Sequence, residues 1–257
     1  MKAETDRDPW YASWFGEEYL ALYPERDDLE AARQAEFALG VLAPYARTGR
    51  AGILDLACGT GRHAVVLSRG DAPVTGLDLS APLLRRARAR RADPAPALVR
   101  ADMRRLPFAR GSFGAVVNFF TSFGYFDEPA DDVRVLSEVA RLLAPGGAFL
   151  SDVFNATRVL STLVSREEKT VADERVTIRR SYDPATRRIE KEITMGTGPG
   201  ARAFRERVRV YLRDELEALH RDARLAVTAA WGDFDGSPFD PKRSPRLILL
   251  AVAGGAR

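Results

Sequence analysis

The most constraining feature of the chain is a short apolar run, Ile53 to Leu56, that leads through a glycine turn at Gly59 to Gly61 into a helix start at Arg62. An apolar strand followed by a glycine turn and a helix is a βα unit. The same alternation continues along the chain, which predicts a mostly parallel, doubly wound α/β sheet. Further strands are expected at 73–77, 97–100, 115–119 and 148–154, and helices at 81–91 and 131–143.

Between Glu168 and Leu212 the pattern changes, and apolar residues alternate with charged ones. This period of two predicts an inserted antiparallel β meander, with strands at 175–182, 188–195 and 204–212. A helix at 213–221 and strands at 224–231 and 246–252 are then expected to complete the main sheet. We therefore expect a main domain of residues 1–167 and 213–257, and an inserted antiparallel β lid of residues 168–212.

Residues 1–50 are expected to form a helical cap. Aromatic residues are crowded into its first half, and an amphipathic stretch follows from Leu29 to Tyr45. The aromatic side chains cover too broad a surface for a single packing seam. They are therefore expected either to pack on the sheet or to close over a bound ligand. These residues are Trp10, Tyr11, Trp14, Phe15, Tyr19 and Tyr23.

Composition excludes several classes of protein. The 257 residues are 46% hydrophobic and 29% charged, as in a folded globular protein. No apolar run approaches the length of about 18 residues that a membrane span needs, and residues 1–10 are polar, so we expect a cytoplasmic protein without a membrane partner. The single cysteine, Cys58, and the histidines His63 and His220 do not form a metal site of known spacing, so no metal is expected. The net charge of only +3, with 35 arginines and four lysines, does not imply a nucleic-acid partner.

The segment Gly59-x-Gly61-x-x-Ala64 fits the loose dinucleotide-binding fingerprint, although it also fits a tight turn without a ligand. A nicotinamide enzyme would need a group that handles hydride, commonly a Tyr-x-x-x-Lys pair. No lysine of this chain lies four residues after a tyrosine. An NAD(P)-dependent oxidoreductase is therefore the least favoured interpretation.

Three acids stand at the ends of three successive predicted strands: Asp55, Asp78 and Asp102. Each alone fits a helix cap or a solvated loop charge. Together they point toward one crevice, because ligands of open α/β sheets bind outside the carboxyl ends of the strands. There Asp78 is placed to accept the hydroxyls of a ribose, and Asp102, followed by Met103, to accept an adenine amino group.

The motifs Asp55-x-x-x-Gly59-x-Gly61, Asp78, Ala101-Asp102-Met103 and 142–147, with the sequence LLAPGG, resemble those of the class I S-adenosylmethionine-dependent methyltransferases. The resemblance covers residues 50–155 and, more weakly, the last two strands. It implies a Rossmann-like, seven-stranded sheet with an antiparallel last strand. The aromatic N-terminus and the inserted meander are similar to the small-molecule branch, which includes glycine N-methyltransferase-like and amino-sugar N-methyltransferase-like enzymes.

The resemblance also implies a site for S-adenosylmethionine (SAM) over the glycine turn. Asp78 would contact the ribose, Asp102 and Met103 the adenine, and the backbone near Asn118 the methionine end. Tyr19 or Arg33 is expected to reach the methionine carboxylate. The full set of expected cofactor residues is Asp55, Ala57, Gly59, Gly61, Asp78, Leu79, Asp102, Met103, Asn118, Phe119, Tyr19 and Arg33.

Methyl transfer from a sulfonium requires no metal and no covalent enzyme intermediate, so alignment in a dry pocket supplies most of the rate. No catalytic residue is therefore identified. The expected pocket walls are Phe119, Phe123 and Tyr125, which leave the carboxyl end of a strand, while Phe120 and Phe126 are expected in the core. His63 is expected to pack locally, and His220 to lie on the surface.

The expected reaction is SAM-dependent methyl transfer to a nitrogen or oxygen of a small molecule, by direct in-line displacement. An RNA or DNA acceptor is less favoured, because Asn118-Phe119-Phe120-Thr121 lacks the prolines and tyrosine of the Asn-Pro-Pro-Tyr motif of nucleic-acid amino-methyltransferases. A non-catalytic SAM-binding protein remains an alternative. We expect a monomer or a homodimer.

Overall fold

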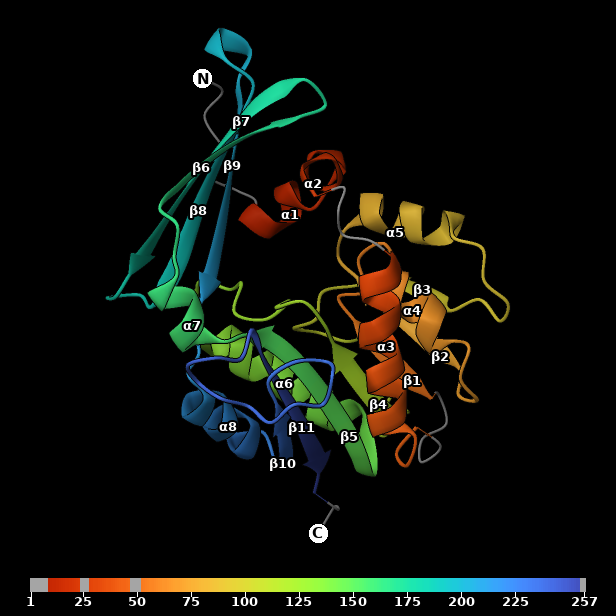
Figure 1. The fold of residues 1–257 in the computed structure, drawn as a ribbon. Coiled ribbons are helices and arrows are strands. Elements are labelled where there is room, and N and C mark those ends of the chain that lie inside the picture. Colours follow the sequence, from red (N-terminus) through yellow and green to blue (C-terminus); the bar gives the residue numbers. More distant parts are fainter. Residues whose placement is uncertain (1–8, 24–27, 47–51, 255–257) are drawn as a thin grey trace.

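The computed structural model describes residues 9–23, 28–46 and 52–254. Its main element is a seven-stranded sheet in the order β10-β11-β5-β4-β1-β2-β3. Strand β11 runs antiparallel to both of its neighbours, and the other neighbouring pairs are parallel. The predicted Rossmann-like sheet with an antiparallel last strand is therefore confirmed (Figure 1). The strands are β1 Ile53–Leu56, β2 Val74–Asp78, β3 Ala97–Arg100, β4 Phe113–Asn118, β5 Leu143–Phe154, β10 Leu225–Trp231 and β11 Arg246–Ala253.

Helices cover both faces of this sheet. Helices α6 (Pro129–Leu142) and α8 (Arg213–Asp222) pack on one face, and α3 (Asp28–Leu42) and α4 (Arg62–Leu67) on the other. Every residue of β1 and β4 is buried, and apart from Asp55 and Asn118 these strands are nonpolar rather than alternating, as expected for parallel strands that are covered on both faces. Helix α5 (Ala81–Ala89) packs beside β2 and β3. None of the helices in the described residues is long and apolar enough to cross a membrane.

The inserted segment forms a separate antiparallel sheet in the order β6-β7-β8-β9. It has one strand more than predicted, because β6 carries mostly charged residues and gives little apolar signal. The last strand ends before Val210 and Tyr211, which are both buried, and Tyr211 packs in the core of the main domain. The boundaries 168–212 for a lid domain stay a prediction. The strands are β6 Arg166–Val171, β7 Glu174–Asp183, β8 Arg188–Met195 and β9 Arg202–Arg209, with α7 (Ala156–Ser161) leading into them and a short 3₁₀ turn (Gly198–Gly200) between β8 and β9.

The N-terminal helices α1 (Trp10–Trp14) and α2 (Glu17–Leu22) pack on the inserted sheet rather than on the main one (Figure 1). Trp10, Trp14 and Leu22 form a buried cluster with apolar side chains of β7 and β8. The broad aromatic surface is explained by this arrangement, because one side of the segment meets the inserted sheet while other rings face a cavity.

The expectation that His220 lies on the surface is wrong. His220 is 1% exposed, its ring stacks on Phe149 with centroids 5.6 Å apart, and its Nδ1 lies 2.7 Å from the carbonyl oxygen of Leu216. Leu216 and His220 are four residues apart and share the face of α8 that meets the sheet. Burial lowers the pKa of His220 to about 4, so the ring is neutral at physiological pH.

Candidate active site

A cavity of about 990 Å³ lies where the carboxyl ends of β1, β2 and β4 meet the N-terminal helices and the inserted sheet. This is the position at which open α/β sheets bind ligands. Several of the predicted site residues are brought together in its walls. They are Tyr19, Ala57, Gly59, Asp78, Leu79, Asp102, Met103, Phe119 and Tyr125.

The two glycines of the turn have different structural roles. Gly59 lines the cavity with φ 56°, and a Cβ there would meet only Leu83 Cδ1, at 3.9 Å. Gly61 has φ 72° and does not line the cavity, and its Cβ would stand 3.0 Å from Cβ of Ala87 on α5. Gly59 therefore leaves open space for a ligand, whereas Gly61 permits the left-handed turn and the close packing of α4 and α5. Gly61 therefore lies outside the cavity wall, contrary to expectation, and the contact of Gly59 with the cofactor stays a prediction.

Asp78 lies at the end of β2, in the cavity wall, and is 9% exposed. Its Oδ2 accepts a hydrogen bond from the Gly59 N–H at 2.8 Å, and its Oδ1 accepts one from the Ser80 N–H at 2.7 Å. Burial raises the pKa of Asp78, although these backbone donors act in the opposite direction. The carboxylate thus holds the glycine turn in place and still faces the cavity.

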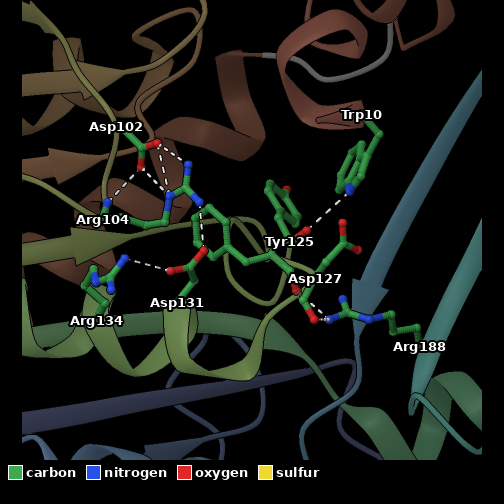
Figure 2. Close-up of polar contacts among 9 residues, drawn as sticks. Trp10, Asp102, Arg104, Tyr125, Asp127, Asp131, Arg134 and Arg188 are labelled. Carbon is green, nitrogen blue, oxygen red and sulfur yellow. Dashed lines mark hydrogen bonds and ion pairs between the residues drawn. The ribbon is translucent and has the colours of Figure 1, made fainter. Parts of the chain in front are cut away.

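Asp102 lies beyond the end of β3, and Arg104 holds both of its oxygens (Figure 2). The guanidinium of Arg104 donates to Asp102 at 2.7–3.1 Å and also to Asp131 of α6 at 2.8 Å. Partial burial raises the pKa of Asp102, but the hydrogen bonds from Arg104 outweigh it and hold the pKa below its usual value. Asp102 is therefore an ionised, oriented acceptor at the edge of the cavity, next to Met103.

Asp55 does not line the cavity, contrary to expectation. Its side chain is 1% exposed, and its Oδ2 has no hydrogen-bond partner among the described residues. Burial, together with the nearby charge of Asp78, raises the pKa of Asp55 to about 7. The residue lies inside the fold next to the glycine turn, and a direct contact of Asp55 with the cofactor stays a prediction.

The raised pKa of Asp55 predicts a pH-dependent stability. Because the folded state keeps the proton up to about pH 7 and the unfolded state releases it near pH 3.8, the free energy of unfolding should fall by about 1.4 kcal/mol per pH unit in between. The Asp55→Asn variant has no titrating carboxyl at this position, so its free energy of unfolding lacks this pH dependence. Urea unfolding at pH 5 and pH 8 should therefore show the variant gaining stability relative to wild type as the pH rises. Parallel pH curves for the two proteins would contradict this assignment.

Three other predicted site residues lie outside the cavity. Arg33 is about 60% exposed and pairs with Asp233 at 4.0 Å, because α3 presents its small residues to the sheet and turns Arg33 outward. The amide of Asn118 donates to the Leu56 carbonyl at 2.8 Å and ties β4 to β1. Phe123 packs in the main core, where its ring lies 5.6 Å from that of Tyr211. Arg33 and Phe123 thus lie away from the cavity, contrary to expectation, whereas the expected contact of the backbone near Asn118 with the methionine end stays a prediction.

The aromatic residues after β4 divide differently from the prediction. Phe119 lines the cavity and stacks on His63 with ring centroids 4.2 Å apart. Phe120 and Phe126 were expected in the core, and the structure also gives both a place in the cavity wall. His63 packs locally as predicted, with Nε2 2.7 Å from Oε1 of Gln34. Burial lowers the pKa of His63 to about 3, so it is neutral at physiological pH.

Sequence reasoning missed a polar group on the inserted sheet. Lys191 of β8 and Glu206 of β9 line the cavity with Nζ and Oε2 3.2 Å apart. Trp14 Nε1 donates to Glu206 Oε1 at 2.7 Å, and the Lys191 ammonium donates to the Tyr23 hydroxyl. Nothing in the alternating pattern of these strands distinguishes the two residues from other charges. The one available signal is that Lys191 is among only four lysines in an arginine-rich chain.

The fold and the cavity together define a Rossmann-like enzyme of the methyltransferase type, and comparisons with known proteins agree. Residues 53–147 match the family model described as a methyltransferase domain. The chain is 32% identical over 184 residues to the dTDP-3-amino-3,4,6-trideoxy-alpha-D-glucopyranose N,N-dimethyltransferase of Streptomyces venezuelae. This match covers 68% of this chain and 75% of the relative. It is 27% identical over 201 residues to the cypemycin N-terminal methyltransferase of a Streptomyces species, covering 77% and 82% of the two chains.

Among solved structures, the CcbJ methyltransferase from Streptomyces caelestis has the same fold, with a TM-score of 0.76 over 94% of this chain and 98% of the other, at 22% identity. The chain therefore belongs to the class I SAM-dependent methyltransferases. It is an enzyme of the small-molecule type, and its cofactor is SAM.

Proposed function

We propose that this enzyme methylates an amine nitrogen of a small molecule by direct in-line displacement. The observation that carries the proposal is a cluster of aromatic side chains in the cavity wall. There the ring of Tyr125 lies 5.0 Å from that of Trp10 and 5.7 Å from that of Phe15, and Phe15 lies 4.9 Å from Tyr19. Aromatic faces attract ammonium and sulfonium charge, which an amine acceptor and the methyl donor both carry during transfer.

The residues present fit the cofactor. Gly59 leaves open space over the turn, and two carboxylates, Asp78 and Asp102, stand at neighbouring strand ends in the same cavity. We propose that Asp78 accepts the ribose hydroxyls, that Asp102 and Met103 bind the adenine, and that Tyr19 contacts the methionine end. When bound, SAM supplies an electrophilic methyl group on a sulfonium centre.

We propose that the chain acts on the acceptor through positioning and through charge. Glu206 places a carboxylate in the cavity wall, and the two donors that reach it, Trp14 and Lys191, leave some of its acceptor capacity for an N–H of the substrate. The N-terminal helices and the inserted sheet line one side of the site, and we propose that they limit the access of water during transfer. The names of two relatives, a cypemycin N-terminal methyltransferase and an amino-sugar N,N-dimethyltransferase, support a nitrogen acceptor.

The test is methyl transfer from radiolabelled SAM to a panel of matched acceptors. Each amine of the panel, including a nucleotide-linked amino sugar and a short peptide with a free N-terminus, is paired with the corresponding hydroxyl compound. We expect labelled product only from amines, and none with the Asp78→Ala variant. Transfer only to hydroxyl compounds would replace the nitrogen acceptor with oxygen. Tight SAM binding without turnover on any acceptor would favour a non-catalytic binding protein.

A further inference from the structure

The loop from Gly124 to Asp127 follows β4 and carries two side chains of the cavity wall, Tyr125 and Phe126. Backbone carbonyls of this loop accept hydrogen bonds from distant parts of the chain (Figure 2). The Arg209 N–H of β9 donates to the Gly124 carbonyl at 2.8 Å, and Trp10 Nε1 of α1 donates to the Tyr125 carbonyl at 3.3 Å. A loop that lacks the regular backbone hydrogen bonds of a strand or helix depends on such contacts for its conformation.

Arg188, the first residue of β8, makes most of the remaining contacts. Its guanidinium donates to the carbonyls of Gly124 at 3.4 Å, of Phe126, and of Asp127 at 3.0 Å. The side chain is 3% exposed and lies outside the cavity wall. Among the described residues no carboxylate comes within ion-pair distance of it, unlike many arginines of this chain. Its planar fork of donors is therefore directed at the loop and not at an acid.

Burial of the Arg188 guanidinium costs desolvation free energy, which its hydrogen bonds to the loop offset. Desolvation lowers the pKa of the Arg188 guanidinium, and a buried cation is stable only when its donors are satisfied. Three loop carbonyls accept hydrogen bonds from Nη1 and Nη2 of this guanidinium. The loop is also closely packed at this point, because a Cβ on Gly124 would stand 2.9 Å from the Arg209 carbonyl oxygen. The conformation of residues 124–127 is thus set largely by the inserted sheet.

We infer that Arg188 is a positioning residue for methyl transfer, which fixes Tyr125 and Phe126 in the acceptor-side wall by holding the carbonyls of their loop. The inference rests on the proposed function in one respect, namely that these rings border the acceptor. It gives the inserted sheet a defined role in the reaction, because a residue that touches neither cofactor nor cavity controls the direction of two wall side chains. A simple anchor of the sheet would instead affect only stability.

The first experiment does not require a known acceptor. The three tryptophan indole N–H groups report on separate sites, and in a ¹⁵N–¹H spectrum the signal of Trp10 reports on its bond to the Tyr125 carbonyl. In Arg188→Met we expect the Trp10 signal to shift, the Trp231 signal to stay, and amide exchange across residues 123–127 to accelerate at least about tenfold. The matched control is Arg175→Met, which removes an exposed arginine of β7 paired with Glu168 and should move none of these signals.

The second experiment separates positioning from stability, using the amine that the acceptor panel identifies. Arg188→Met should bind SAM within about twofold of wild type and lose at least about tenfold in kcat/KM for the amine, mainly through kcat. Arg188→Lys keeps a buried cation but lacks the fork, so we expect an intermediate loss, and it serves as the test variant if Arg188→Met does not fold. An unchanged Trp10 signal and unchanged exchange, or a loosened loop with full turnover, would overturn the inference. Absence of turnover in wild type would instead count against the proposed function, and the spectroscopic result would still decide whether Arg188 holds the loop.

Discussion

Replacement of Asp78 with alanine is expected to weaken SAM binding by at least about 100-fold and to leave the seven-stranded sheet folded. The carboxylate faces the cavity and holds the Gly59 N–H at 2.8 Å, so its removal takes away the proposed ribose acceptor and a support of the turn. Hydrogen bonds to a charged group contribute about 1.5–3 kcal/mol each, and a tenfold change in affinity corresponds to about 1.4 kcal/mol. Calorimetric titration with SAM measures the effect directly.

The control for Asp78→Ala is Asp222→Ala, which removes an exposed carboxylate at the end of α8, away from the cavity. Its SAM affinity should equal that of wild type. Circular dichroism and the unfolding temperature of both variants show whether the sheet is retained. Unchanged SAM affinity in a folded Asp78→Ala protein would remove Asp78 from the cofactor site.

Replacement of Trp14 with alanine should have the largest effect on stability, about 3–5 kcal/mol, confined mainly to the N-terminal helices and the inserted sheet. Trp14 is 1% exposed, packs on Phe204 with centroids 4.8 Å apart, and donates to Glu206 at 2.7 Å. Its loss leaves a cavity in this unit and removes one hydrogen bond from the Glu206 carboxylate, which Lys191 still contacts. Hydrogen exchange of residues 10–22 and 174–209 should accelerate strongly, while β1 and β4 remain protected.

The matched control for Trp14→Ala is Leu29→Ala on α3, where the side chain is 81% exposed and its removal should change little. Uniform destabilisation of both sheets in Trp14→Ala would contradict the conclusion that the N-terminal helices and the inserted sheet form a separate packing unit.

The same exchange measurement on wild type tests whether residues 10–22 close over the cofactor. Greater protection of these residues with SAM present supports closure, since Tyr19 and Phe15 line the cavity. Equal protection with and without SAM would leave this segment as a scaffold.

Local patterns were sufficient to predict the central sheet. The apolar strand before Gly59, the acids at the ends of β2 and β3, and the period-two insertion each express a rule that operates over a few residues. The same reasoning missed β6, where charged residues on both faces hide the alternation. It also placed His220 on the surface, because the sequence of a mostly charged helix does not show whether a histidine lies on its buried or its exposed face.

The sequence by itself determined the fold class, the glycine turn and two of the three acids at the crevice, Asp78 and Asp102, because strand period, glycine conformation and strand ends are local properties. Only the tertiary structure decided which side chains face the cavity. Arg33 turns outward and Phe123 turns into the core, whereas Lys191 and Glu206 reach the cavity from a sheet more than 100 residues downstream of the glycine turn. These placements depend on how helices, loop and inserted sheet pack against each other. Contacts between distant segments leave no periodic signal in the chain, so they cannot be predicted from the pattern of neighbouring residues.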